Sequence, residues 1–261
     1  MDCSQAIVTL FLLVPCDQGG GDSTGSSMDL AIAEALAAPE RIAADRTQDA
    51  LRRPDLVLAF FEICPGMTVL DLFSGGGYYT EIVSRVVGDA GKVVAHNNDA
   101  YLAFAREGLA GRYDGDRLSN VERVIAEADA LELDADRFDA ALVLLTWHDF
   151  YYVDAENGWP EIDEAAMVSK LCAALKPGAV LGVTDHVAAA GSEPTDSAQT
   201  LHRIDPQRIK DDLVGDCFAY EGEISALRNF ADDLDQPMSA DGIRGRTDRV
   251  VFKFRRKPFP D

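Results

Sequence analysis

Two polar pairs, His148-Asp149 and Asp185-His186, each follow a run of apolar residues. An imidazole has an ordinary pKa of about 6.5, so at neutral pH it can remove a proton from a hydroxyl or amine nucleophile. We therefore favour His148 as a general base, with Asp149 as its orienting partner or as a second candidate. His186 and His202 are further candidates that could converge with it. The alternative is that His148 only packs or hydrogen-bonds in a pocket wall.

A glycine-rich turn is the second feature with a chemical meaning. The apolar run 68–72, which contains Asp71, leads into the turn 73–77 and then into a helical pattern. A strand, a tight turn and a helix N-terminus make a site where backbone can approach a nucleotide closely. A pyrophosphate-binding loop avoids a carboxylate there, because the helix N-terminus is holding an anion. Asp71 therefore favours a cationic or neutral cofactor, and a plain flexible turn is the alternative.

The composition narrows the classes of partner. The chain has 261 residues, of which 47% are hydrophobic and 26% charged, enough for one large domain or two small ones. Its formal net charge is −21. A protein this acidic is repelled by phosphate backbones, so we do not expect nucleic acid as a substrate. No apolar run reaches the ~18 residues needed to cross a bilayer.

The cysteines give no sign of a metal site or a disulfide framework. There are five of them, an odd number, and none shows CxxC spacing. We expect isolated thiols, some of them packed in the core. The five are Cys3, Cys16, Cys64, Cys172 and Cys217.

Residues 1–27 differ from the rest of the chain and are expected to form a leader and flexible tether. The apolar run 6–14 ends at Pro15-Cys16, and a Gly/Ser-rich stretch follows. This order resembles a bacterial lipoprotein leader with a lipid anchor at Cys16, which would place the protein in the cell envelope or periplasm. Pro15 and the lack of Lys or Arg before the apolar run argue against a leader. The alternative is a disordered extension that arises from a start site upstream of Met28, and the protein would then be cytoplasmic.

From Met28 onward the pattern alternates between helices and strands. We expect an N-terminal helical cap over residues 28–64 and one larger domain over residues 65–261. Near-continuous apolar strands are typical of a parallel sheet covered on both faces, and the alternation predicts a doubly wound α/β sheet with its site at the carboxyl ends of the strands. Predicted strands cover residues 68–72, 92–96, 121–126, 138–145 and 179–185; predicted helices cover 79–87, 100–109, 165–175 and 205–213. Runs 218–224 and 249–254 predict an antiparallel hairpin at the sheet edge.

Taken together, these motifs resemble a known superfamily. From Glu40 to Phe254 the chain looks like a class I S-adenosylmethionine (SAM)-dependent methyltransferase, and within that superfamily like a group of bacterial predicted methyltransferases of unassigned substrate. The broad resemblance is carried by the glycine-rich turn at 69–80 and the Lys-Pro-Gly turn at 176–178. Narrower motifs are Ala44-Asp45-Arg46, Asp185-His186, His202-Arg203-Ile204-Asp205 and residues 243–249. The resemblance implies a Rossmann-like sheet of seven strands whose last strand is antiparallel.

The resemblance also implies a cofactor, SAM, with S-adenosylhomocysteine as the product. Asp71, Gly75 and Gly77 match the family's first motif, with Gly76 between the two glycines, while Phe73 replaces the usual first glycine. The glycines would let the backbone pass close to the methionine part of SAM. Asp71 would lie near its ammonium or sulfonium, where a carboxylate is electrostatically favourable.

Two further positions would bind the adenosine part. Asn97 lies 20 residues after Gly77, close to the spacing of about 20 at which an acid binds the ribose hydroxyls. An amide carries no charge and should bind the ribose more weakly, and Asp99 is a second candidate for this role. Asp129 matches the position that holds the adenine amine, with a simple turn acid as the alternative.

The implied activity is methyl transfer to oxygen or nitrogen of a small-molecule acceptor. Asp149, Asp185 and His186 match the positions where the catechol O-methyltransferase type holds magnesium. Histidine suits magnesium poorly, so we expect no metal. Two rival functions stay open: a SAM-binding or sensing module without turnover, which Phe73 and Asn97 favour, and an NAD-dependent oxidoreductase, which Asp71 disfavours. The sequence indicates neither the acceptor nor the oligomeric state.

Overall fold

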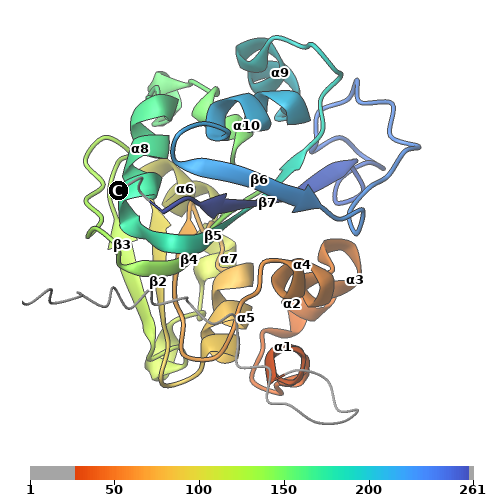
Figure 1. Cartoon of the computed structure of the whole chain (residues 1–261). Coiled ribbons are helices and arrows are strands. Elements are labelled where there is room, and N and C mark those ends of the chain that lie inside the picture. Colours follow the sequence, from red (N-terminus) through yellow and green to blue (C-terminus); the bar gives the residue numbers. More distant parts are fainter. Residues whose placement is uncertain (1–26, 259–261) are drawn as a thin grey trace, which may run out of the picture.

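The computed structural model describes residues 27–258, and these form an α/β fold around a sheet of seven strands in the order β3-β2-β1-β4-β5-β7-β6 (Figure 1). The strands β1 to β5 pair in parallel with their neighbours, whereas β7 pairs antiparallel with both β5 and β6. The predicted doubly wound sheet with a terminal antiparallel hairpin is therefore confirmed. The strands are β1 Thr68–Leu72, β2 Lys92–Asn97, β3 Val121–Ile125, β4 Phe138–Leu144, β5 Leu175–His186, β6 Phe218–Glu223 and β7 Arg249–Arg256.

Helices cover both faces of the sheet because its central strands are apolar on both sides. Successive side chains of a strand point to opposite faces, so Val69 joins one hydrophobic cluster and Leu70 the other. The first cluster packs beneath α1 Ser27–Ala37, α4 Pro54–Phe60 and α5 Tyr78–Val87, and the second beneath α8 Glu164–Ala174 and α10 Pro206–Leu213. Figure 1 shows the first three helices on one side of the sheet and α8 and α10 on the other.

Local signals set most of the element boundaries. Pro54 begins α4, Asp163 caps α8 through the amide of Ala166, and Asp205 caps α10 through the amide of Gln207. The predicted helix 100–109 is instead two short helices, and Asn98 caps the first of them. The remaining short elements are α2 Ala43–Arg46, α3 Asp49–Arg52, α6 Asp99–Phe104, α7 Arg106–Leu109, α9 Pro194–Leu201 and the 3-10 turns η1 Asp114–Asp116, η2 His148–Phe150 and η3 Ala155–Asn157.

The expectation of isolated thiols is wrong. Cys172 and Cys217 form a disulfide with their Cα atoms 6.1 Å apart, and Cys64 is also disulfide-bonded. Folding brings the C-terminal end of α8 beside the start of β6, a proximity that neither the odd cysteine count nor the spacing encodes. The expected leader and Cys16 lie outside the described residues. Within residues 27–258, no helix is long and apolar enough to span a membrane.

Candidate functional site

The glycine turn is a left-handed stretch of backbone between β1 and α5. Phe73, Gly75 and Gly77 have φ angles of 50°, 55° and 76°, a region that glycine enters without steric cost. A Cβ atom on Gly77 would lie 2.5 Å from Cδ of Arg112, so only glycine fits at this helix N-terminus. A Cβ atom on Gly76 would lie 3.2 Å from a backbone Cα of α7. The turn is therefore a close-packed cradle of backbone rather than a loose loop.

Asn97, at the end of β2, holds this turn in place. Its Oδ1 accepts a hydrogen bond from the amide of Gly75 at 2.8 Å, and its Nδ2 donates to Ser74 Oγ at 3.0 Å and to the Gly75 carbonyl at 3.1 Å. The side chain is 5% exposed. An aspartate here could accept from Gly75 but could not donate the other two bonds. The structure thus gives Asn97 a clamping role in the turn, while ribose binding by Asn97 stays a prediction.

Asp71 is buried at the carboxyl end of β1, beneath the turn. Its Oδ2 accepts a hydrogen bond from the Thr80 hydroxyl at 2.6 Å. Burial raises the pKa of Asp71 to about 6, and the bond from Thr80 offsets only part of that rise. A positively charged group beside Asp71 would favour its ionised form, which fits the cationic SAM that the resemblance implies.

Aromatic rings occupy the strand ends next to the turn. The Phe73 ring stacks on Tyr101 with centroids 5.0 Å apart and meets His96 edge-on at 4.8 Å. The Phe150 ring lies 6.1 Å from that of Phe73, and the Trp159 ring meets Tyr101 edge-on with centroids 5.0 Å apart. This aromatic packing accounts for a phenylalanine at a backbone position that ordinarily favours glycine, and it forms one wall between the ends of β1 and β4.

Asp129 lies apart from these groups, in the connection after β3. Its side chain is exposed and accepts a hydrogen bond from the amide of Ala130 at 2.8 Å. Lys170 of α8 donates to the Asp129 carbonyl at 2.7 Å and so fixes the local backbone. The contact with Ala130 is that of a turn acid, and binding of adenine by Asp129 stays a prediction.

His148 and its carboxylate neighbours lie at the ends of β4 and β5. Nδ1 of His148 is 2.7 Å from Oδ1 of Asp185, and Nε2 is 3.2 Å from Oδ1 of Asp149. Asp185 Oδ2 also accepts a hydrogen bond from the His148 amide at 2.7 Å. Asp185 thus orients the ring, a role that sequence reasoning assigned to Asp149. The parallel pairing of β4 with β5 brings these residues together across 37 positions of sequence.

The other two C-terminal histidines also reach this cluster. The His202 ring lies 5.6 Å from that of His148, and its Nδ1 is 3.9 Å from Oδ1 of Asp149. His202 has a φ of 50° at the C-terminal end of α9, and this turn of the backbone directs its ring toward η2. The His186 ring lies 6.0 Å from His148, but its Nδ1 is bonded to Thr247 Oγ1 at 2.6 Å. The expected convergence of the three histidines is therefore present in the fold.

Burial and neighbouring charges shift the pKa values of these groups. Burial lowers the pKa of His148, but the Asp149 and Asp185 carboxylates outweigh it and raise that pKa to about 9. Burial likewise raises the pKa of Asp149, while His148, His202 and the Tyr101 hydroxyl bring it below its usual range. Burial and the neighbouring His148 place the pKa of His186 well below its ordinary value. The two carboxylates therefore favour the protonated ring of His148, which would meet an acceptor as a hydrogen-bond donor and would bind a metal or accept a proton only after that proton is displaced.

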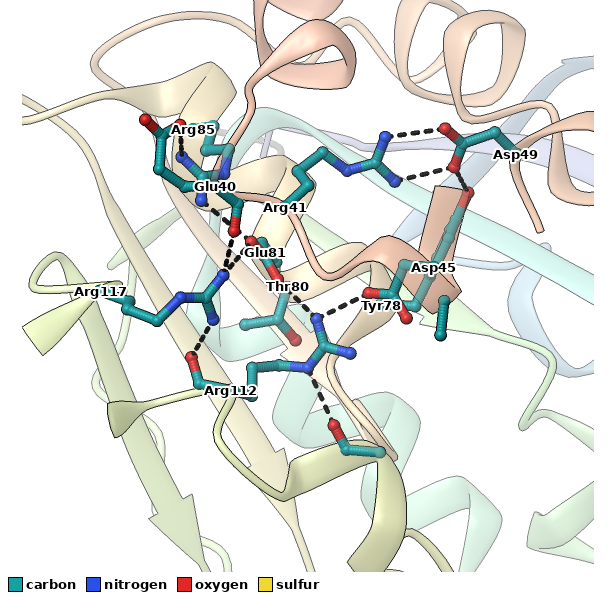
Figure 2. A network of polar contacts seen from close by, with 12 residues as sticks. Glu40, Arg41, Asp45, Asp49, Tyr78, Thr80, Glu81, Arg85, Arg112 and Arg117 are labelled. Carbon is teal, nitrogen blue, oxygen red and sulfur yellow. Dashed lines mark hydrogen bonds and ion pairs between the residues drawn. The ribbon is translucent and has the colours of Figure 1, made fainter. Parts of the chain in front are cut away.

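A network of arginines and acids attaches the N-terminal helices to α5, just after the glycine turn (Figure 2). Buried Arg112 bridges Asp45 of α2 and Glu81 of α5, at 2.8 and 2.7 Å. Arg117 also contacts Glu81, at 2.8 Å. Asp49 of α3 accepts from the Tyr78 hydroxyl at 2.7 Å and, as Figure 2 shows, pairs through both oxygens with Arg41. This network was not anticipated from the sequence, although Asp45 belongs to one of the motifs singled out there.

Sequence comparison finds similarity to methyltransferases over part of the chain. A family model for protein-L-isoaspartate(D-aspartate) O-methyltransferase matches residues 34–118. The ubiquinone/menaquinone biosynthesis C-methyltransferase UbiE of Shewanella halifaxensis is 34% identical over 122 residues, which cover 46% of this chain and 43% of that protein. UbiE of an Enterobacter species is 46% identical over 79 residues, 30% of each chain. The match thus spans less than half the length of these curated relatives.

Solved structures extend the likeness to most of the chain. A SAM-dependent methyltransferase from Aquifex aeolicus superposes with a TM-score of 0.55 at 19% identity, covering 85% of this chain and 97% of the other. The [4+2]-cyclase SpnF gives 0.54 at 18% identity, covering 92% and 100%. At these identities the likeness establishes the fold. Together the comparisons confirm the predicted resemblance to class I SAM-dependent methyltransferases, including the seven-stranded sheet.

Proposed function

We propose that this chain is a SAM-dependent methyltransferase that transfers a methyl group to oxygen or nitrogen of a small-molecule acceptor. The observation that carries the proposal is the buried carboxylate of Asp71 beneath a glycine turn of positive φ at the end of β1. Its pKa of about 6 means that a cationic ligand gains by stabilising the charged form. The sulfonium and ammonium groups of SAM are positively charged, whereas the pyrophosphate of a dinucleotide is negatively charged.

The residues divide into a cofactor group and an acceptor group. Gly75, Gly77 and Asp71 would hold SAM, which supplies an electrophilic methyl group on a sulfonium. The chain itself must orient the acceptor so that its nucleophilic atom lies in line with that methyl group. The aromatic wall around Phe73 and the polar cluster around His148 border the same edge of the sheet, and they would bind an aromatic or apolar acceptor through one face and its polar atom through the other.

The nature of the acceptor is open to a direct screen. The UbiE relatives are named for C-methylation in quinone biosynthesis, so a panel should contain hydroquinones besides catechols, simple phenols and amines. Incubation with SAM labelled in its methyl group, followed by mass spectrometry of the products, identifies both the acceptor and the methylated atom. Methylation at oxygen or nitrogen supports the proposal. Methylation only at carbon would still identify the chain as a methyltransferase, but it would refute oxygen or nitrogen as the acceptor atom.

A SAM-binding module without turnover is the second candidate function. Two observations favour it: the side-chain amide of Asn97 is committed to the glycine turn, and Phe73 fills space at the strand ends. The fold by itself does not assign methyl transfer, since SpnF shares it and is a [4+2]-cyclase. Calorimetry of the full chain with SAM, S-adenosylhomocysteine and NAD separates the candidates. Binding of NAD without SAM would refute the proposal, and SAM binding without turnover on the whole panel would favour the module.

We also propose that the protein matures in an oxidising compartment. The disulfide between Cys172 and Cys217 supports this, because such bonds persist in the cell envelope and are rare in the cytosol. Cell fractionation with labelled palmitate, compared between the natural chain and Cys16→Ser, tests the predicted lipid anchor. Alkylation before lysis tests the redox state. A cytosolic product with all five cysteines alkylated would overturn the proposal.

A further inference from the structure

We propose that His148, Asp149 and His202 form a binding site for a divalent transition metal of the zinc class. One donor atom from each residue lies within 4.8 Å of the other two. The contacts assign these atoms as Nε2 of His148, Oδ1 of Asp149 and Nδ1 of His202. The site revises the expectation of no metal, which considered Asp149 together with Asp185 and His186 and did not include His202.

The spacing of the donors is close to that of a bound ion. Zinc bonds of about 2.0–2.1 Å in a tetrahedron place neighbouring ligand atoms about 3.3 Å apart. His148 Nε2 and Asp149 Oδ1 are separated by 3.2 Å, and His202 Nδ1 lies 3.9 Å from the same oxygen. The His202 side chain is 35% exposed at a helix end, so its ring can close the remaining gap by a small side-chain rotation. The exposure also gives an ion a route from solvent.

The atoms that would not bind the metal already have partners that orient the ligands. Nδ1 of His148 is held by the fully buried Asp185 carboxylate at 2.7 Å, which leaves Nε2 directed at Asp149. Tyr101 donates its hydroxyl proton to Oδ2 of Asp149, which leaves Oδ1 for the ion. A carboxylate behind a ligating histidine and a donor behind a ligating carboxylate are the usual outer partners of metal sites. An ion pair between His148 and Asp149 that binds no metal would not require both of these outer partners.

The ligand set selects the kind of metal. Two imidazoles and one carboxylate suit zinc and related ions, whereas magnesium prefers an octahedron of oxygen atoms. Three protein ligands leave a fourth position open, as in catalytic rather than structural zinc sites. If the proposed methyl transfer holds, on which this role rests, an acceptor hydroxyl in that position would lose its proton more readily because the ion stabilises the alkoxide or phenoxide.

Metal binding can be measured without any acceptor. We expect equilibrium dialysis of the full chain against Zn²⁺, followed by elemental analysis, to find one ion per chain, and dialysis against Mg²⁺ at the same concentration to find none. His202→Gln and Asp149→Asn should each weaken zinc binding at least tenfold. Asp196→Asn is the matched control, because Asp196 is an exposed carboxylate on α9, the helix that His202 follows. Circular dichroism of each variant verifies that it is folded.

Cobalt distinguishes this site from binding by cysteine. Co²⁺ on two histidines and a carboxylate should give visible d–d bands without the intense near-ultraviolet band of thiolate ligands. No zinc binding by the natural chain, equal zinc binding by both ligand variants and the control, or a thiolate band would each overturn the site. SAM calorimetry on the same samples is independent: zinc binding without SAM binding refutes only the proposed function, and SAM binding without zinc binding refutes only the metal site.

Discussion

The two halves of the strand-end edge are built on opposite principles. At the ends of β1 and β2, two buried side chains are hydrogen-bonded within the turn: Asn97 uses its whole amide on the turn, and Asp71 accepts a hydrogen bond from the Thr80 hydroxyl. At the ends of β4 and β5, two carboxylates and two imidazoles crowd together, and His202 keeps an open face. The first half is a pre-formed turn whose side-chain amide and carboxylate are already hydrogen-bonded, and the second keeps charged groups beside the partly exposed ring of His202. The difference predicts that the two halves can be broken separately.

The strongest disruption of the cradle should come from Glu81→Gln. The Glu81 carboxylate is 1% exposed and contacts Arg85, Arg112 and Arg117, and removing one partner of a buried ion pair typically costs about 3–5 kcal/mol. Urea unfolding should show a loss of this size, and calorimetry at a temperature where the variant is folded should show weaker SAM binding with zinc binding retained. Asp134→Asn, in an exposed pair, is the control and should lose less than about 1 kcal/mol. Similar losses for both variants would contradict the buried network.

Asp71→Asn should change how stability depends on pH. The folded pKa of Asp71, about 6, exceeds its ordinary value of 3.8, so the folded state holds the proton more tightly than the unfolded chain. The natural protein should therefore lose roughly 2 kcal/mol from this group as pH rises from 4 to 7. The variant should lack that decrease and bind SAM more weakly. Urea unfolding at several pH values measures this change in the free energy of unfolding, and Asp89→Asn, at an exposed position, is the control. If stability depends on pH in the same way for Asp71→Asn and the natural chain, the raised pKa of Asp71 is refuted.

Asp185→Asn should impair the polar cluster at the ends of β4 and β5 and leave the glycine turn unchanged. An amide can still accept the bond from the His148 backbone but no longer balances a charged ring, and loss of such an outer partner lowers metal affinity or turnover by about 10–100-fold. Zinc affinity, and turnover once an acceptor is known, should fall by that amount while the SAM dissociation constant stays the same. An equal fall in SAM affinity would show that the two halves are not separable.

Substitutions at Asn97 should have the smallest effect on SAM affinity, and they distinguish the role of Asn97 in the turn from ribose binding. Asn97→Ala removes three hydrogen bonds to the turn, and we expect SAM affinity to fall about tenfold, or about 1.4 kcal/mol. Asn97→Asp keeps the bond from the Gly75 amide and adds a charge that can bind ribose, so it should recover part of the loss. Calorimetry of both variants measures the balance. If Asn97→Ala binds SAM as the natural chain does, the turn does not depend on its clamp.

Local sequence was sufficient for the sheet and for the glycine turn that joins β1 to α5. Caps such as Asp163 and Asp205, the prolines after a cap, and the glycine turn each act within a few residues, so their effects are readable along the chain. The contact of Asp185 with His148 and the bridge from Arg112 to Glu81 join residues 37 and 31 positions apart. These depend on strand register and helix packing. For the same reason the pairing of Cys172 could not be predicted, since cysteine spacing does not state which helix ends meet.

The disulfide closes a covalent ring over residues 172–217, and that ring contains Asp185 and His202 but not His148 or Asp149. A protease that cuts within α9 or the loops beside it would therefore leave two fragments tied together. They would migrate as one band on a denaturing gel until a reductant is added. In such a cleaved molecule the disulfide still links the fragment that carries Asp185 to the fragment that carries His202. We therefore expect that cleavage in this region need not separate these two residues of the polar cluster.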